Sequence, residues 1–507
     1  MKRPLLVWFR EDLRVDDQRA LLAAVDDADA RGVPVHAVWC AVPQQWDAHG
    51  MGDNRRWFVL AAVRELAQRL AAAGIPLAVL DAGDFSGSTV AVARHAQAIG
   101  AAALYFNDEY PLNEVRRDAA MTALCAPAGI QVCRFHDGVL VPPDAVFSQS
   151  GTPYTVFTPY RQAWYRQLAA DPLLAPRAFR APAVPVAEPQ RQAELAATLH
   201  TIDGLQSALS VPATVRAAWE PGEREAQRRL KRFTGGSIQR YRDARDLPAE
   251  PGTSTLSPYL AAGCLSPRRA LAAARGVNHG DVADGNAGIV TWISELAWRD
   301  FYRQVMFHFP HVAKGRAFRR GTDAVPWRCP PDEIAAWQEG RTGYPLVDAA
   351  MRQLVATGWM HNRLRMVTAM FLSKDLLVDW RIGERFFAQH LVDWDFAANN
   401  GGWQWSASTG TDAAPYFRLF NPVRQGERFD PEGRFVRHWL PELRQVPDRC
   451  VHAPWLAGRG GRRAAADLFT APAFPEPIID HAHAKARVLA AFRAAAAAGD
   501  PLQEQAS

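Results

Sequence analysis

The chain has 507 residues, of which 48% are hydrophobic and 22% are charged, and its formal net charge is +5. This length exceeds the size at which one hydrophobic core usually stops growing, so we expect two domains in an ordinary soluble globular protein. The weak positive charge mildly favours an acidic partner such as nucleic acid, but it does not exclude a small neutral substrate.

Cysteine spacing and the length of the apolar runs exclude further classes. The six cysteines are scattered without a C-x-x-C pair, which argues against a zinc ribbon or a disulfide framework and favours reduced thiols. The N-terminal apolar run is too short for a signal peptide, and no segment reaches the roughly 18 unbroken apolar residues of a membrane span. We therefore expect a cytoplasmic protein with no membrane partner.

The first part of the chain contains five short apolar runs, which are PLLVWF, VPVHAVW, IPLAVLDA, AALYFN and IQVCRF. Longer segments with apolar residues at helical spacing, such as RWFVLAAVRELAQRLAAAG, alternate with these runs. This alternation predicts an α/β domain over residues 1–135, with a parallel Rossmann-like sheet and flanking helices. No G-x-G-x-x-G follows the first run, so the usual dinucleotide-binding fingerprint is absent.

The pattern changes after this domain. Residues 172–200 are rich in Pro and Ala and lack periodicity, so we interpret residues 136–205 as an interdomain linker. Helical patterns with almost no convincing strand follow. They predict an all-α domain over 206–475 and a C-terminal helix and tail over 476–507. We interpret His481 and His483 as solvated imidazoles rather than as a metal site.

Tryptophan is concentrated in the predicted helical domain, where ten of the seventeen lie between residues 292 and 439. Large aromatic side chains often simply fill a helical core. Indole rings also stack on nucleic-acid bases and are easily oxidised, so the cluster has a functional interpretation as well.

Two segments of this domain combine groups that suit a ligand site. GTSTLSPYLAAGCLSPR has hydroxyl and backbone N–H groups just before a helical run, an arrangement that caps a helix and can equally bind a phosphate. TWISELAWRDFYRQ has Trp292, Glu295, Trp298 and Arg299 on one helix face. An aromatic, acidic and basic face suits a cavity in which planar rings stack. Further along, Asp393 is a plausible partner for Arg365, although a buried Arg–Asp pair can be purely structural.

The chain closely resembles the photolyase/cryptochrome family, and within it the bacterial photolyases that repair cyclobutane pyrimidine dimers with a folate antenna. The motifs that carry the resemblance are LVWFREDLR, FTPYRQAW, GTSTLS, ELAWRDFY, GYPLVDAAMRQL, GWMHNRLRM, NNGGWQW, STGTDAAPYFRLFNP and WLPELR. They are long and cover nearly the whole chain. The resemblance implies a carbon–carbon lyase that reverses such dimers with light.

The resemblance implies that reduced FAD is bound in the helical domain. The residues matching the flavin-binding positions are Tyr241, Thr253, Ser254, Thr255, Leu256, Ser257, Trp292, Glu295, Arg299, Asn362, Arg365, Asp393, Trp394, Asp395 and Asn399. Asn399 matches the residue that faces flavin N5, where a neutral amide imposes no charge. Family members commonly carry glycine at position 394, so the indole of Trp394 is a departure that the flavin pocket must accommodate.

The resemblance also implies roles in repair and electron supply. Glu295, Trp298, Asn362, Met366 and Trp405 match residues that hold the flipped dimer against the flavin, and together with Asn399 they are the expected catalytic set. Arg245, Arg363 and Gln425 match further DNA-contacting positions. Trp327, Trp380 and Trp403 match the chain of indoles that carries electrons to an oxidised flavin. We expect no metal ion, because electron transfer from FAD needs neither a metal nor a protein nucleophile.

An antenna chromophore is implied as well. His49, Asn113, Glu114 and Lys314 match positions that bind methenyltetrahydrofolate, and a deazaflavin is the alternative. We expect UV-damaged DNA as the partner of a monomer with no obligate protein partner. Three other functions remain open: a cryptochrome photoreceptor, a (6-4) photolyase, and a light-independent flavin oxidoreductase, for which no nicotinamide fingerprint appears.

Overall fold

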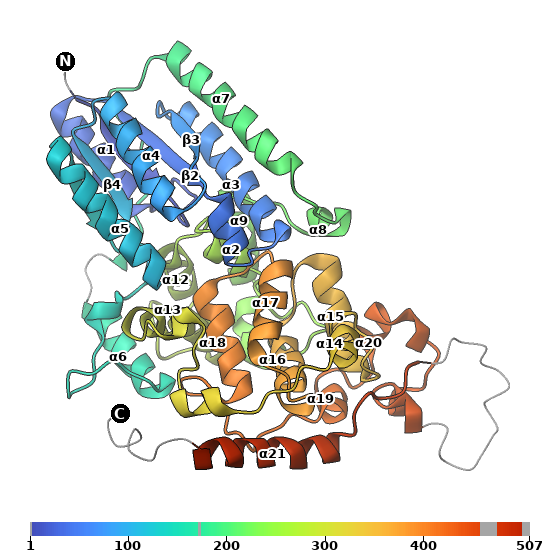
Figure 1. Cartoon of the computed structure of the whole chain (residues 1–507). Coiled ribbons are helices and arrows are strands. Elements are labelled where there is room, and N and C mark those ends of the chain that lie inside the picture. The colour runs from blue at the N-terminus through green and yellow to red at the C-terminus, as the bar shows by residue number, and fades with distance from the viewer. Residues whose placement is uncertain (1–2, 171–173, 457–473, 499–507) are drawn as a thin grey trace. The chain divides into compact units, whose positions relative to one another are not determined.

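The computed structural model describes residues 3–170, 174–456 and 474–498 and is coloured along the chain in Figure 1. The chain divides into two compact units. The first unit comprises residues 1–242, 254–310 and 392–397, and the second comprises 243–253, 311–391 and 398–507. The predicted domain boundaries stay a prediction. Parts of the predicted helical domain (457–473) and of the tail (499–507) lie outside the described residues.

A five-stranded parallel sheet begins the first unit. Its strands are β1 Leu5–Phe9, β2 Val35–Ala41, β3 Leu77–Asp81, β4 Ala103–Asn107 and β5 Gln131–Phe135. Their order is β3-β2-β1-β4-β5, so the first strand is central. All of β1 is buried, as expected for a parallel strand covered on both faces. Each of the five predicted apolar runs is confirmed as a strand.

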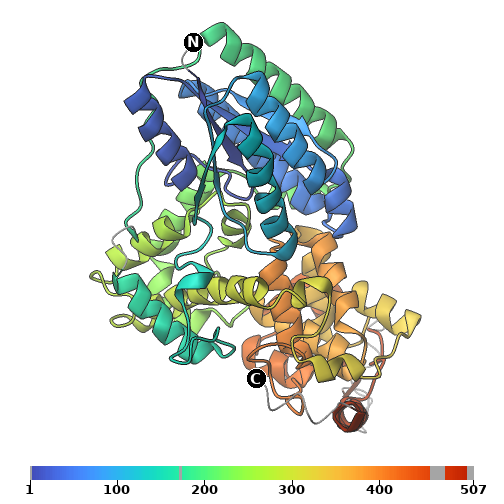
Figure 2. The same cartoon turned by 60° about the vertical axis from the view of Figure 1, so that its left-hand side comes forward.

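Helices cover both faces of this sheet (Figure 2). They are α1 Arg19–Arg31, α2 Pro43–Ala48, α3 Asp53–Ala72, α4 Phe85–Ala98 and α5 Leu112–Cys125. The strand order reverses direction between β1 and β4. Right-handed crossovers therefore put α1 and α3 on one face and α4 and α5 on the other.

The predicted linker contains two helices that the sequence pattern did not reveal, α6 Phe157–Ala170 and α7 Glu188–Ser207. Figure 1 shows α7 running beside α3. Thr198 Oγ1 donates to the carbonyl of Leu77, 2.6 Å away, so α7 also covers the edge strand β3. Only Thr198 and Ile202 of α7 are buried, and two buried residues in twenty produce no detectable periodicity.

Among the described residues, the remaining regular elements of both units are helices, and the predicted all-α character of the C-terminal part is confirmed. In the first unit the helices are α8 Ala213–Ala218, α9 Glu223–Thr234, α11 Ser257–Ala261, α12 Pro267–Gly276 and α13 Ala287–His308. α10 Tyr241–Ala244 and α18 Phe396–Ala407 cross the unit boundaries. The second unit has α14 Pro331–Gln338, α15 Pro345–Thr357, α16 Asn362–Met370, α17 Trp380–His390, α19 Pro422–Phe429, α20 Arg434–Trp439 and α21 His481–Ala498.

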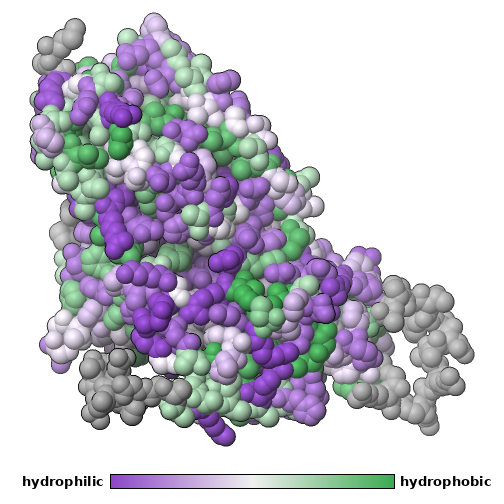
Figure 3. Space-filling view, viewed as in Figure 1, coloured by the Kyte–Doolittle hydropathy of each residue, from purple (hydrophilic) through white to green (hydrophobic). Residues whose placement is uncertain are grey.

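The surface view agrees with a globular protein. Hydrophilic and hydrophobic residues are interspersed on the face of each unit seen in Figure 3. No helix in the described part of the chain has the length and hydropathy needed to span a bilayer. All six cysteines are free, as expected.

His481 is not a solvated imidazole, so that interpretation was wrong for this residue. Its Nδ1 lies 2.5 Å from Oδ1 of the buried Asp375. Arg487, also on α21, donates to the carbonyl of Asp375. These contacts hold α21 against the π-helical turn Phe371–Asp375.

Candidate functional site

Helix α13 carries four of the predicted flavin and lesion residues. Its first turn is capped by Asn286, whose side chain accepts from the N–H groups of Gly288 and Ile289. Trp292 is buried and lies 5.5 Å from the ring of Phe233, which in turn lies 6.0 Å from Tyr241. The structure thus joins two predicted flavin residues, Trp292 and Tyr241, in one aromatic cluster.

Trp298, two turns along α13, lies in a different aromatic group. Its ring stacks face to face on Phe157 of α6, with 3.6 Å between centroids and 10° between planes. Glu295 and Trp298 are both partly exposed, whereas Trp292 is not. The predicted face of the helix is therefore divided between a buried end and an accessible end.

Arg299 is a partly buried cation that bonds backbone oxygens. It donates to the carbonyls of Gly138 and, at 3.0 Å, of Leu260. Burial, followed by the positive charge of Arg303, lowers the pKa of Arg299 to about 10. An anion beside Arg299 would offset this penalty. Arg303, which the sequence analysis missed, forms an ion pair of 2.8 Å with the predicted flavin residue Asp395.

The segment Thr253–Ser257 has an unusual backbone. Thr255 has φ +51°, the left-handed region that a β-branched residue rarely adopts. Its Oγ1 accepts from Arg229 at 2.9 Å and donates to the carbonyl of Ser254 at 2.8 Å. Such strain costs about 1–3 kcal/mol and is concentrated at functional sites. Arg229, on the basic helix α9, was missed.

Helix α16 begins at the predicted lesion residue Asn362, which is exposed. Its cap is His361, whose Nδ1 accepts from the N–H of Arg363 at 3.2 Å. Burial lowers the pKa of His361 to about 4, so the imidazole is neutral at neutral pH. Met366, one turn along, is partly exposed.

The predicted arginines of α16 have partners within the second unit. Arg363 forms a 2.8 Å ion pair with Asp246 and lies over the ring of Phe429. Arg365 donates from Nε to the carbonyl of Met360 at 2.8 Å. Its expected pairing with Asp393, which belongs to the first unit, stays a prediction.

A chain of amides surrounds Asn399, the residue expected to face flavin N5. Nδ2 of Asn399 donates to the carbonyl of Glu384 at 3.0 Å. The neighbouring Asn400 donates to the Glu384 carboxyl at 2.8 Å and accepts from Gln404 at 2.9 Å. The bond from Nδ2 orients the Asn399 amide, and the bonds of Asn400 orient the Glu384 side chain. Glu384 and Gln404 were not predicted, because their spacing resembles that of ordinary core helices.

The three tryptophans of the predicted electron chain lie on adjoining segments of the second unit. Trp403 packs against Gly383 of α17, one turn from Trp380. The residue after Trp327 forms a parallel bridge with Val378, two residues before Trp380. Within the described residues, all three indole N–H groups are buried without a hydrogen-bond partner.

Three of the antenna residues follow strands of the sheet at its carboxyl edge. His49 follows β2, and Asn113 and Glu114 follow β4. Nε2 of His49 lies 3.3 Å from Nδ2 of Asn113 and 2.7 Å from Nε2 of Gln45. Burial, followed by the charge of Glu109, raises the pKa of Glu114 to about 8. The fourth residue, Lys314, belongs to the second unit.

Four other predicted residues have simpler surroundings. Trp394 is 8% exposed and lies 6.4 Å from Phe396, so the first unit accommodates the larger ring. Trp405 is partly exposed on α18. Gln425 has a buried side-chain oxygen without a hydrogen-bond partner among the described residues. Arg245 directly precedes Asp246, the partner of Arg363.

Two family models match the chain. The model described as DNA photolyase matches residues 5–183, and the FAD binding domain of DNA photolyase matches residues 292–494. The deoxyribodipyrimidine photo-lyase of Escherichia coli K12 is 43% identical over 97% of this chain and 98% of its own length. That of Salmonella typhimurium LT2 is 44% identical with the same coverage. The chain belongs to the DNA photolyase family.

Solved structures of photolyases and cryptochromes share the fold. A bacterial class III photolyase from Agrobacterium tumefaciens has a TM-score of 0.84 and 34% identity, covering 98% of both chains. An archaeal photolyase from Sulfolobus tokodaii, solved with two FAD molecules, has a TM-score of 0.77 and 30% sequence identity, and the match covers 97% of this chain and 99% of that one. A cryptochrome from Synechocystis has a TM-score of 0.78 and 28% sequence identity, with the same coverage of the two chains. Photolyases and cryptochromes therefore share this fold, which does not by itself separate repair from signalling.

Proposed function

We propose that this photolyase-family chain is a deoxyribodipyrimidine photo-lyase that splits cyclobutane pyrimidine dimers in UV-damaged DNA, using light and reduced FAD. The observation that carries the proposal is the agreement over 97% of the chain with enzymes named for this activity. A cryptochrome photoreceptor is the weaker alternative, because the cryptochrome structure is only 28% identical. We further propose a cytoplasmic monomer with no obligate protein partner.

The residues of each unit fit FAD. In the first unit, Arg299 is a partly buried cation, and a neighbouring anionic group would counteract the lowering of its pKa. Thr255 has a strained backbone beside hydroxyl groups. In the second unit, Asn399 has an uncharged amide that is oriented by its bond to the Glu384 carbonyl. FAD supplies the light-absorbing redox group when bound. The side-chain amide of Asn399 would form a hydrogen bond with flavin N5 without adding charge. Arg299 and the Thr253–Ser257 segment would bind the FAD phosphates.

The proposed lesion contacts are Glu295, Trp298, Asn362, Met366 and Trp405. All five are at least partly exposed, as residues that receive an extruded base must be. Arg245, Arg363 and Gln425 are the proposed contacts to the rest of the DNA. Arg363 already pairs with Asp246, so it would bind a phosphate only by sharing or exchanging that partner.

The three tryptophans are proposed to relay electrons to an oxidised FAD. Their indole N–H groups have no protein acceptor among the described residues. We expect Trp327→Phe to slow light-driven reduction of oxidised FAD severalfold but to spare repair by chemically reduced enzyme. Absorption spectra recorded during illumination measure the rate of FAD reduction. An assay with a dimer-containing oligonucleotide measures repair by the chemically reduced enzyme. Equal loss of both would contradict the relay role.

For the antenna we propose methenyltetrahydrofolate, with a deazaflavin as the alternative. The convergence of His49, Asn113 and Glu114 at the carboxyl edge of the sheet supports a ligand there, since open parallel sheets bind ligands at that edge. Absorption spectra of the protein incubated with each chromophore distinguish the two. A His49→Ala variant that takes up folate as well as the parent chain does would contradict the assignment.

The decisive test concerns the lesion. Repair of (6-4) products needs proton transfer to and from the lesion, whereas splitting a cyclobutane ring needs only an electron. His361 has a pKa of about 4, so it cannot serve as a protonated acid at neutral pH, and Asn362 and Met366 cannot either. Illuminated reduced enzyme should restore an oligonucleotide carrying a cyclobutane dimer and leave a (6-4) oligonucleotide unchanged. The reverse result would overturn the proposal, and no repair of either lesion would favour the photoreceptor.

A further inference from the structure

The stack between Phe157 and Trp298 joins two segments that the sequence analysis treated separately. Phe157 begins α6, inside the predicted linker, whereas Trp298 is a proposed lesion contact on α13. Their rings are nearly parallel, at 10°, with centroids 3.6 Å apart. The ring of Phe157 therefore lies directly on one face of the indole.

Phe157 is itself firmly held. Its side chain is 5% exposed and meets the ring of Phe301 edge to face at 5.7 Å. The guanidinium of Arg161, one turn along α6, lies 5.7 Å from the Phe157 ring and donates to Ser294 Oγ at 3.2 Å. Ser294 lies one turn before Trp298 on α13. The two helices are therefore locked together on both sides of the stack.

This support changes what Trp298 can do. An indole on a helix surface normally samples several rotamers. When a base stacks on it, ordering the ring reduces the favourable free energy of binding. Here Phe157 restricts the ring before any ligand arrives, while part of the indole stays exposed. A planar pyrimidine ring therefore meets a surface that is already oriented.

We propose that Phe157 is a positioning residue for lesion recognition, holding the indole of Trp298 in the orientation that stacks on an extruded pyrimidine dimer. The proposal rests on the proposed function. It extends the recognition site to α6. Undamaged duplex DNA keeps its bases stacked inside the helix, so it gains nothing from an oriented indole. Phe157 should accordingly affect selectivity for the lesion rather than general affinity for DNA.

The test measures binding in the dark, so that no repair occurs. Two fluorescent oligonucleotides of the same sequence, one with a single thymine cyclobutane dimer, are titrated with the full chain. We expect Phe157→Leu to lower the preference for the dimer by about five- to tenfold, the size of a lost aromatic stack. Phe157→Tyr keeps the ring and should retain the preference. Phe106→Leu is the matched control, since Phe106 is buried beside a different tryptophan, Trp8.

A double-mutant cycle separates positioning from general damage to the fold. If Phe157 acts through Trp298, then Phe157→Leu combined with Trp298→Ala should show the same preference as Trp298→Ala alone. An undiminished preference in Phe157→Leu, or an equal loss of affinity for both oligonucleotides, would overturn the inference. A parent chain that does not prefer the dimer at all would overturn the proposed function itself, together with the inference.

Discussion

Glu384 is a carboxyl group whose protonation affects both stability and the amides around Asn399. Burial raises its pKa from 4.5 to about 7, and Asn400 donates to it. Because the folded state holds this proton more tightly than the unfolded state, the contribution to stability is full below pH 4.5. It is lost as the pH rises to about 7.

Replacing Glu384 by Gln should remove this pH dependence while keeping an acceptor for Asn400. We expect the decrease in unfolding free energy between pH 5 and pH 8 to shrink by about 2 kcal/mol in Glu384→Gln. Urea unfolding at pH 5 and pH 8, with equal FAD content in the samples, measures this decrease. Glu339→Gln, at an exposed position, should leave the decrease unchanged. An unaltered pH dependence in Glu384→Gln would mean that this carboxyl titrates normally.

Gly383 allows α17 to approach the indole of Trp403. A Cβ at this position would lie 2.0 Å from Cη2 of that ring. The ring cannot retreat easily, since Trp337 and Phe387 pack against it at 6.0 and 5.0 Å. Gly383→Ala should therefore lower the unfolding free energy by about 1–3 kcal/mol.

The same substitution should slow light-driven reduction of FAD, because it displaces a tryptophan of the proposed relay. Gly204→Ala on α7 is the control, since its added Cβ meets no atom within 4 Å. That control should be neutral or slightly stabilising, by up to about 1 kcal/mol. Equal stability of the two variants would show that α17 adjusts to the extra carbon.

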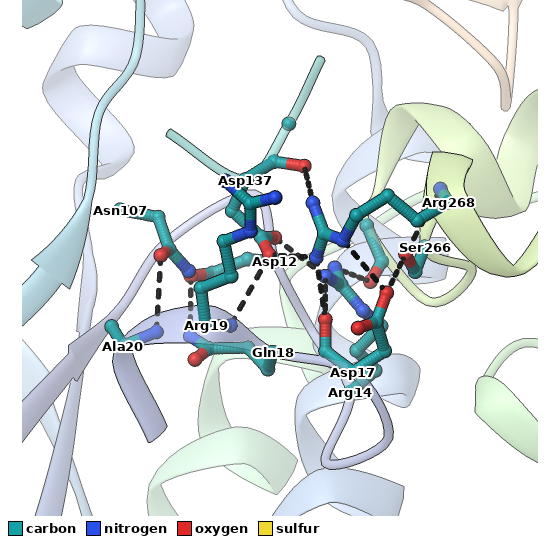
Figure 4. Close-up of polar contacts among 12 residues, drawn as sticks. Asp12, Arg14, Asp17, Gln18, Arg19, Ala20, Asn107, Asp137, Ser266 and Arg268 are labelled. Atoms are coloured by element: carbon teal, nitrogen blue, oxygen red, sulfur yellow. Dashed lines mark hydrogen bonds and ion pairs between the residues drawn. The ribbon is translucent and has the colours of Figure 1, made fainter. Parts of the chain in front are cut away.

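Helix α12 is joined to the sheet by a buried network of charges, drawn in Figure 4. Asp137, which follows β5, lies 2.5 Å from Arg14 and 2.6 Å from Arg268 of α12. Arg268 also pairs with Asp17 at 3.0 Å. Burial alone would raise the pKa of Asp137, but the two guanidinium groups hold it well below its usual range.

Removing one charged partner from this buried network should lower the unfolding free energy much more than removing the partner of an exposed ion pair. Asp137→Asn leaves Arg14 and Arg268 short of negative charge in the interior, and we expect a loss of about 3–5 kcal/mol. Asp26→Asn is the matched control. Asp26 also pairs with two arginines, Arg177 and Arg180, but at the surface. Asp26→Asn should therefore lower the unfolding free energy by about 1 kcal/mol or less. Chemical denaturation measures the unfolding free energy of both variants. Similar losses in the two variants would contradict the structural role of the network.

The positive charge of the whole chain comes almost entirely from arginine, with only five lysines among 58 basic residues. Arginine binds phosphate in a bidentate geometry, which suits a DNA-binding surface. If about five phosphates are contacted, affinity for dimer-containing DNA should fall roughly 10²–10³-fold between 50 and 200 mM salt. Binding titrations across that range measure the slope. A salt-independent affinity would exclude the phosphate backbone as a major contact.

Local patterns in the sequence predicted the elements with strong periodicity. The five apolar runs became the five strands, because a buried parallel strand needs only a short continuous apolar segment. α7 was missed because only Thr198 and Ile202 of its twenty residues are buried. Helical spacing placed Trp298 on a candidate ligand face, whereas only the family motifs predicted a role for Asn399.

The sequence by itself determined the sheet, the helical second half and the family, since each depends on residues close together in the chain. Only the tertiary structure decided which distant residues meet: Phe157 with Trp298, Asp137 with Arg14 and Arg268, and Gly383 with Trp403. Such contacts have no signature in local spacing. They arise when helices and loops far apart in the chain pack to exclude water and to pair their buried charges.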